Sequence, residues 1–246
     1  MRLAVNIDHI ATVRNARGCS VPDLVESARI AERAGVDGIV CHLREDRRHI
    51  RDEDVRTLRK IITTKLDLEM AATPEIISVA LSVKPDLVTL VPEKREELTT
   101  EGGLDIYRLR KTLKRVVKQF HEHHIPVSLF VDPDTVQIKT AKDIEADFIE
   151  LHTGDYANAR STASIKKHLR IITEMASLGR ELGLRVNAGH GLDYNNIKPI
   201  ADISDIELRR TGCRCQAERC HCTRSPLRSP DLRRRKSDEG SRIHAG

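Results

Sequence analysis

The chain has 246 residues, of which 39% are hydrophobic, so it carries enough apolar material for a sizeable core. Its formal net charge is +5, yet residues 207–246 hold 11 Lys and Arg against 5 Asp and Glu, which leaves 31 against 32 in residues 1–206. No apolar stretch approaches the roughly 20 residues of a membrane span, and no secretory layout opens the chain. We therefore expect a cytoplasmic protein with free thiols rather than a membrane protein.

Seven short apolar runs recur along the chain, and each ends in polar residues. A parallel strand that is buried on both faces has a near-continuous run of Val, Ile and Leu. The runs lie at residues 3–9, 38–46, 66–71, 86–94, 126–134, 147–155 and 185–191. Each run is predicted to form a parallel strand.

The segments between these runs have helical patterning. Pro22 and Asp23 open one such segment and Gly35 ends it, as is typical of helix termini. The predicted helices lie at residues 22–35, 52–64, 74–84, 104–124, 135–146, 159–182 and 195–204. Strands that alternate with helices at a spacing of roughly 30 residues predict an α/β fold, the (β/α)8 TIM barrel.

The alternating pattern stops after Asp205. Residues 207–246 contain only four large apolar side chains, too few to offset the entropy of ordering, so we expect disorder there. The sequence thus predicts a TIM-barrel domain over residues 1–206 and a basic Cys/Arg-rich tail over 207–246. The eighth βα unit is expected to be missing or replaced by this tail, which would leave two open strand edges.

Side chains suited to proton transfer follow several of these strands, where TIM barrels carry their catalytic groups. Because side chains alternate along a strand, His42 and Arg44 point to the same side. The imidazole of His42 is suited to proton transfer near neutral pH, and the guanidinium of Arg44 supplies donors for phosphate oxygens. Glu69 lies in an apolar run, where desolvation would make it a base, or where it pairs with an arginine. His190 lies between two glycines and is either a ligand-facing group or a plain turn residue.

Six motifs occur in order along residues 1–206. They are NIDHIATVRNARG (6–18), VCHLREDRRHI (40–50), LEMA (68–71), LVPEKREELTTEGGLD (90–105), ELHTGDYA (150–157) and VNAGHGLDYNN (186–196). Together they resemble the PdxJ family, the pyridoxine 5'-phosphate synthases. The resemblance implies a TIM barrel that assembles as a homo-octamer and needs no metal or organic cofactor. It also implies condensation of 1-deoxy-D-xylulose 5-phosphate with 3-amino-2-oxopropyl phosphate.

The same resemblance implies roles for individual residues. His42 and Glu69 would be proton acceptors and His190 the proton donor. The implied substrate contacts are Asp8, His9, Arg44 and His49 for the sugar phosphate, Asn6 and Arg17 for the amino-ketone phosphate, and Gly191 and Thr99 for bound ligand, with Thr100 hard to separate from Thr99. Glu150 and His152 point into the same site by their strand positions.

The chain departs from the family pattern at the eighth strand. The family has an Asn-Ile-Gly-His-like motif there, whose Gly-His pair holds the amino-ketone phosphate, followed by a terminal helix. Here the stretch reads LRRTGCR, so Gly212 falls near the expected glycine and Cys213 replaces the histidine. The abrupt change of composition is typical of a reading-frame shift. The alternative to an active synthase is therefore a catalytically impaired variant.

The tail offers a third interpretation. Its four cysteines have the pattern C-x-C-x4-C-x-C, with His221 inside, and could bind zinc, while its arginines could bind nucleic acid. However, C-x-C is tighter than the common zinc pair, and residues 207–246 have no aromatic side chain for base stacking. We therefore expect phosphorylated small molecules as partners, and neither a metal nor a nucleic acid nor a membrane.

Overall fold

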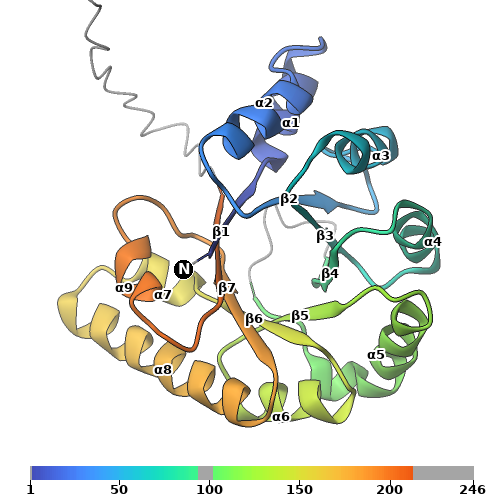
Figure 1. The fold of residues 1–246 in the computed structure, drawn as a ribbon. Coiled ribbons are helices and arrows are strands. Elements are labelled where there is room, and N and C mark those ends of the chain that lie inside the picture. The colour runs from blue at the N-terminus through green and yellow to red at the C-terminus, as the bar shows by residue number, and fades with distance from the viewer. Residues whose placement is uncertain (1, 94–101, 213–246) are drawn as a thin grey trace, which may run out of the picture. The chain divides into compact units, whose positions relative to one another are not determined.

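Eight parallel strands close into a barrel, and helices surround it (Figure 1). The computed structural model describes residues 2–93 and 102–212, which belong to one compact unit. The strands are β1 (Arg2–Asn6), β2 (Gly38–Leu43), β3 (Lys65–Met70), β4 (Leu87–Leu90), β5 (Val127–Val131), β6 (Phe148–His152), β7 (Arg185–Gly189) and β8 (Leu208–Gly212). Each strand pairs with the next, and β8 pairs with β1, so the predicted TIM barrel is confirmed.

The helices follow the strands in alternation. They are α1 (Asp8–Arg17), α2 (Leu24–Arg33), α3 (Asp52–Ile61), α4 (Pro74–Val83), α5 (Ile106–His121), α6 (Thr135–Asp143), α7 (Gly154–Asn158), α8 (Thr162–Glu181) and α9 (Ile197–Ala201). Asp23 caps α2 by accepting the N–H of Glu26. The run expected as a strand over residues 3–9 ends earlier, at Asn6, because Asp8 already lies in the first turn of α1.

The core is almost wholly aliphatic. In α5, for example, Ile106, Leu113 and Phe120 recur at seven-residue spacing and are buried, which gives the helix one face toward the barrel. Burial of each such side chain stabilises the fold by about 1.5–3 kcal/mol. Among residues 2–93 and 102–212, no helix combines the length and the apolar character that a bilayer crossing requires.

The eighth strand is present, and this corrects the expectation that it is missing. Residues Leu208–Gly212 pair with all of β1, from Arg2 to Asn6, and with the end of β7. The strand therefore belongs to the barrel, although the sequence pattern placed it in the tail. The predicted disorder of the tail, Cys213 and the family's terminal helix lie outside the described residues.

Two buried arginines explain why β8 was not predicted from the sequence. Arg209 and Arg210 are each about 3% exposed and so interrupt the apolar pattern of the strand. Arg209 donates to the carbonyl oxygens of Ala201 and Ile203, at 3.0 and 2.7 Å. Arg210 points the other way and pairs with carboxylates inside the barrel. Buried charges are tolerated when they are paired or hydrogen-bonded, and only the tertiary structure supplies these partners.

Candidate functional site

The predicted proton acceptors lie next to each other at the carboxyl ends of two neighbouring strands. His42 of β2 and Glu69 of β3 are partners in the register of the sheet. Asn6 ends β1, and His190 follows directly after β7. Since all strands of the barrel run parallel, these four residues lie toward the same rim.

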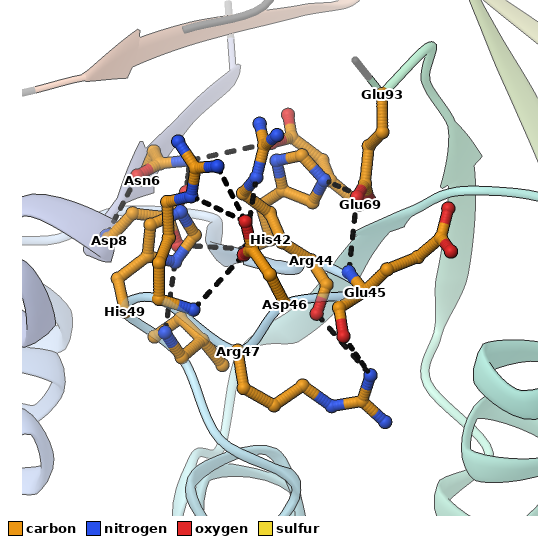
Figure 2. A network of polar contacts seen from close by, with 12 residues as sticks. Asn6, Asp8, His42, Arg44, Glu45, Asp46, Arg47, His49, Glu69 and Glu93 are labelled. Carbon is orange, nitrogen blue, oxygen red and sulfur yellow. Dashed lines mark hydrogen bonds and ion pairs between the residues drawn. The ribbon is translucent and has the colours of Figure 1, made fainter. Parts of the chain in front are cut away.

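His42 is held on two sides by carboxylates. Its Nε2 lies 2.9 Å from Oε1 of Glu93, and its backbone N–H donates to Oδ1 of Asp8 at 2.8 Å. The second carboxylate oxygen of Glu93 accepts the backbone N–H of Glu45 at 3.0 Å. Figure 2 shows this network beside Asn6 and Glu69. The carboxylate at Nε2 orients the ring and favours a proton on that nitrogen.

Burial and neighbouring charges raise the pKa values of two of these groups. Burial opposes a charged His42, but the hydrogen bond to Glu93 and the charges of Glu69 and Asp8 outweigh it and raise the pKa of His42 above 6.5. Burial, with the charge of Glu69, raises the pKa of Asp8 to about 7. Asp8 can therefore exchange a proton near pH 7, while His42 holds its proton more firmly than a free imidazole does.

Glu69 joins this network to the interior of the barrel. Its Oε1 accepts from Nη1 of Arg210 at 3.1 Å, and its Oε2 lies 3.5 Å from Nδ2 of Asn6. The same amide donates to Oδ2 of Asp8 at 2.9 Å. Of the two interpretations of Glu69 from the sequence, pairing with an arginine is thus present, and the side chain as a whole is still 17% exposed.

Arg210 is shared among three carboxylates. Besides Glu69 it contacts Asp67 and Glu150, and its Nη2 donates to the hydroxyl of Thr89 at 2.7 Å. Burial raises the pKa of Glu150 to about 8 and that of Asp67 to about 6, with Arg210 opposing both shifts. One guanidinium cannot neutralise three carboxylates, two of them buried, so the cluster retains a proton near neutral pH.

The segment after β2 places a second histidine near His42. The ring centroids of His49 and His42 are 6.0 Å apart, and Nδ1 of His49 accepts the N–H of Ile50 at 2.9 Å. Burial, with the charges of His42 and Arg44, lowers the pKa of His49 to about 4. The neutral ring therefore carries its proton on Nε2, where it can donate to a ligand oxygen.

A metal ion fits this cluster poorly. Ligand atoms of Asp8, His42 and His49 lie within 4.8 Å of one another, which is close enough to share a cation. However, the N–H of Ile50 occupies one nitrogen of His49, and the other nitrogen must then keep its proton. A metal ligand must be an unprotonated nitrogen, so His49 is set up as a donor instead.

A second group of aromatic rings surrounds His190. Its ring centroid lies 4.9 Å from that of His152 and 6.1 Å from that of Phe130. Nδ1 of His152 lies 3.0 Å from Oδ1 of Asp132, which directly follows β5. His190 itself has a φ of 82°, a left-handed conformation that is uncommon for a residue other than glycine.

Of the other predicted residues, some lie at the same rim, and others are exposed or lie outside the described residues. Gly212 ends β8 opposite Asn6, and Arg44 is buried at the end of β2 with its Nε 3.7 Å from Oδ1 of Asp46. His9 lies in the first turn of α1, and Gly191 follows His190, whereas Arg17 is exposed in the last turn of α1. Thr99 and Thr100 lie outside the described residues. A groove of about 540 Å³ between α4 and α5 contains none of the predicted residues.

Three residues of this site were not predicted from the sequence. Glu93 and Asp132 lie near the carboxyl ends of two of the predicted strand runs, 86–94 and 126–134, so the rule that catalytic groups lie at the ends of barrel strands would have marked both. Arg210 carried no such signal, because its strand was not recognised.

Comparison with known proteins agrees with the fold and the motifs. Residues 3–217 match the family described as "Pyridoxal phosphate biosynthesis protein PdxJ". The "Pyridoxine 5'-phosphate synthase" of Chlorobium chlorochromatii (strain CaD3) is 58% identical over 207 residues, which cover 84% of this chain and 88% of that protein. The protein of the same name from Geotalea daltonii is 55% identical over 211 residues, or 86% of this chain and 88% of the relative.

Solved structures resemble the chain in fold alone. The structure titled KGPDC from Streptococcus mutans has a TM-score of 0.58 and 16% identity, and covers 86% of this chain and 87% of its own. A phosphoribosylanthranilate isomerase from Thermotoga maritima has a TM-score of 0.51 and 15% identity, with 86% and 87% covered. The solved structures show the fold alone, whereas the family match and the high identity of the relatives show the family. The chain belongs to the PdxJ family of enzymes.

Proposed function

We propose that this chain synthesises pyridoxine 5'-phosphate by condensing 1-deoxy-D-xylulose 5-phosphate with 3-amino-2-oxopropyl phosphate, releasing phosphate and water. Its family and the printed name of its relatives support the synthase activity. The observation that carries the proposal is the pairing of His42 with Glu69 across β2 and β3, beside an Asp8 whose pKa is about 7.

Each proposed proton-transfer group has a distinct environment. His42 acts as a base whose ring is oriented by Glu93, and Glu69 acts as a second base beside Asn6. His190 acts as the proton donor from the opposite side of the β1–β8 pair. Joining an amine to a ketone and expelling water and phosphate needs repeated proton transfers, and each positioned group contributes about 10²–10⁴-fold.

Phosphate recognition is proposed on the same rim. Arg44 and the Nε2–H of His49 supply donors for phosphate oxygens, as charge-assisted and neutral hydrogen bonds. The remaining proposed contacts are Asp8 and His9 for the sugar phosphate, Asn6, Arg17 and Gly212 for the amino-ketone phosphate, and Gly191 and Thr99 for bound ligand. Arg17 is exposed in the last turn of α1, so among the described residues the structure gives it no contact with the buried part of the site.

The direct test incubates the full chain with both substrates and measures pyridoxine 5'-phosphate by mass spectrometry. We expect product from the wild type and from His123→Gln, a control at an exposed histidine, and a loss of at least about 100-fold for His42→Gln or His190→Gln. A folded wild type that makes no product would favour the impaired variant instead.

We further propose that the chain forms a homo-octamer and uses neither metal nor nucleic acid. Size-exclusion chromatography with light scattering measures the assembly directly. Activity that survives a chelator, and a chain that is not retained on a nucleic-acid column, are the expected results. Metal-dependent activity or firm retention would favour the interpretation based on the cysteines and arginines of residues 207–246.

A further inference from the structure

His152 is a buried imidazole that the proposed reaction has not yet used. It ends β6, is 8% exposed, and lies between the carboxylate of Asp132 and the ring of His190. Oδ1 of Asp132 also accepts the N–H of Gly103 at 2.9 Å, which fixes the carboxylate from a second direction. An ionised carboxylate at Nδ1 places the proton of the neutral imidazole on that nitrogen.

The ring of His152 has no room to turn. The edge of the ring meets Phe130, with 5.2 Å between ring centroids. On its other side lies Gly154, where a Cβ atom would stand only 2.5 Å from Nε2 of His152. The backbone approaches the imidazole so closely that any residue larger than glycine at position 154 would have to displace the ring. The ring is therefore locked by packing as well as by the hydrogen bond to Asp132.

The end of β6 also holds the backbone of His190. Oγ1 of Thr153 lies 2.7 and 2.6 Å from the carbonyl oxygens of Gly189 and His190, and its one proton is shared between these two acceptors. These contacts support the left-handed conformation of His190, which costs energy outside glycine and persists only when its surroundings impose it. The last residue of β6 and the residue that follows it thus contact both the side chain and the main chain of the proposed proton donor.

We propose that His152 and Asp132 are positioning residues for His190: they hold its ring in the proton-donating orientation and favour its charged form. The proposal rests on the proposed function only for the role of His190 as proton donor. The negative charge of Asp132 lies behind His152, and a polarised imidazole next to a second imidazole stabilises a positive charge on it.

Other charged groups near His190 must be counted in any test that depends on pH. Glu150 and Arg210 lie below it in the barrel, where a Cβ on Gly189 would meet both of them. Asp193 lies in the segment that follows His190. Arg210 pairs with Asp67 and Glu69 as well as with Glu150, so its charge is taken up inside the barrel, and Asp132 supplies the charge that the proposal invokes.

The test compares Asp132→Asn, His152→Phe and His152→Asn with His123→Gln as the control. In the full chain, the imidazole of His190 is titrated by NMR with labelled histidine, and its signal is assigned by its absence from His190→Gln. We expect Asp132→Asn and His152→Phe to lower the pKa of His190 by about half a unit or more. We expect kcat to fall about 10- to 100-fold with KM within about twofold, and the alkaline limb of kcat/KM to move to lower pH.

His152→Asn is the conservative rescue. Its amide can replace the Nδ1 donor toward Asp132, so it should retain more activity than His152→Phe. An unshifted His190 titration in both Asp132→Asn and His152→Phe, measured on folded protein, would overturn the proposal. If His190→Gln keeps full activity, the assigned proton donor is wrong, yet the NMR titration still decides whether Asp132 and His152 act on His190.

Discussion

Replacing Arg210 with methionine removes the positive charge that Asp67, Glu69 and Glu150 share, while it keeps most of the buried volume. Removal of one partner from a buried ion pair typically costs about 3–5 kcal/mol, because the remaining charge has lost its compensation. Arg210 is about 3% exposed, so solvent screening does not reduce this cost. At about 2–4 °C per kcal/mol for a protein of this size, the Tm should fall by roughly 10 °C at pH 8.

The loss of stability in Arg210→Met should depend on pH. The folded pKa values of Asp67 and Glu150, about 6 and about 8, lie above the unfolded values of 3.8 and 4.5. The folded state therefore holds protons that the unfolded chain releases, and stability falls as pH rises through 6 and 8. Without Arg210 both pKa values rise further, so the decline from pH 5 to pH 8 should steepen.

Arg209→Met is the matched control on the opposite side of the same strand. Arg209 is equally buried but donates to the carbonyl oxygens of Ala201 and Ile203, so its loss leaves no buried anion. Urea unfolding followed by far-UV circular dichroism suits a chain without tryptophan. The reasoning is refuted if Arg210→Met loses no more stability than Arg209→Met at pH 8, or if both show the same change with pH.

Three further substitutions test other parts of the site. Glu93→Gln should lower the pKa of His42, because it removes the strongest cause that raises it; the acidic limb of kcat/KM should move to lower pH, and an unmoved limb would contradict this. Glu150→Gln should raise stability near pH 8, where ionisation of the buried carboxylate costs free energy, and the gain in urea unfolding should vanish near pH 4.5. Gly154→Ala should cost about 1–3 kcal/mol, because its Cβ would displace the ring of His152; unchanged unfolding would show that the ring can move.

Seven strands and the fold class could be predicted because a parallel strand that is buried on both faces has a continuous run of apolar residues, which is visible in the sequence. The eighth could not, since Arg209 and Arg210 are acceptable inside the protein only through partners from β3, β6 and the turn before β8. The location of His42 and Glu69 at the rim could also be predicted, because both lie near the carboxyl ends of predicted strands. Their immediate partners could not, because which side chains meet across a barrel depends on register and closure.

Closure of the barrel also affects how the chain folds while it is being translated. β1 is made first, yet its pairing with β8 joins residues about two hundred positions apart, from Arg2 with Leu208 to Asn6 with Gly212. Contacts between such distant segments form slowly, because the chain must first pay the entropy of a very long loop. The nascent chain must therefore emerge almost to Gly212 before its first strand finds its second neighbour, and until then it depends on protection from aggregation.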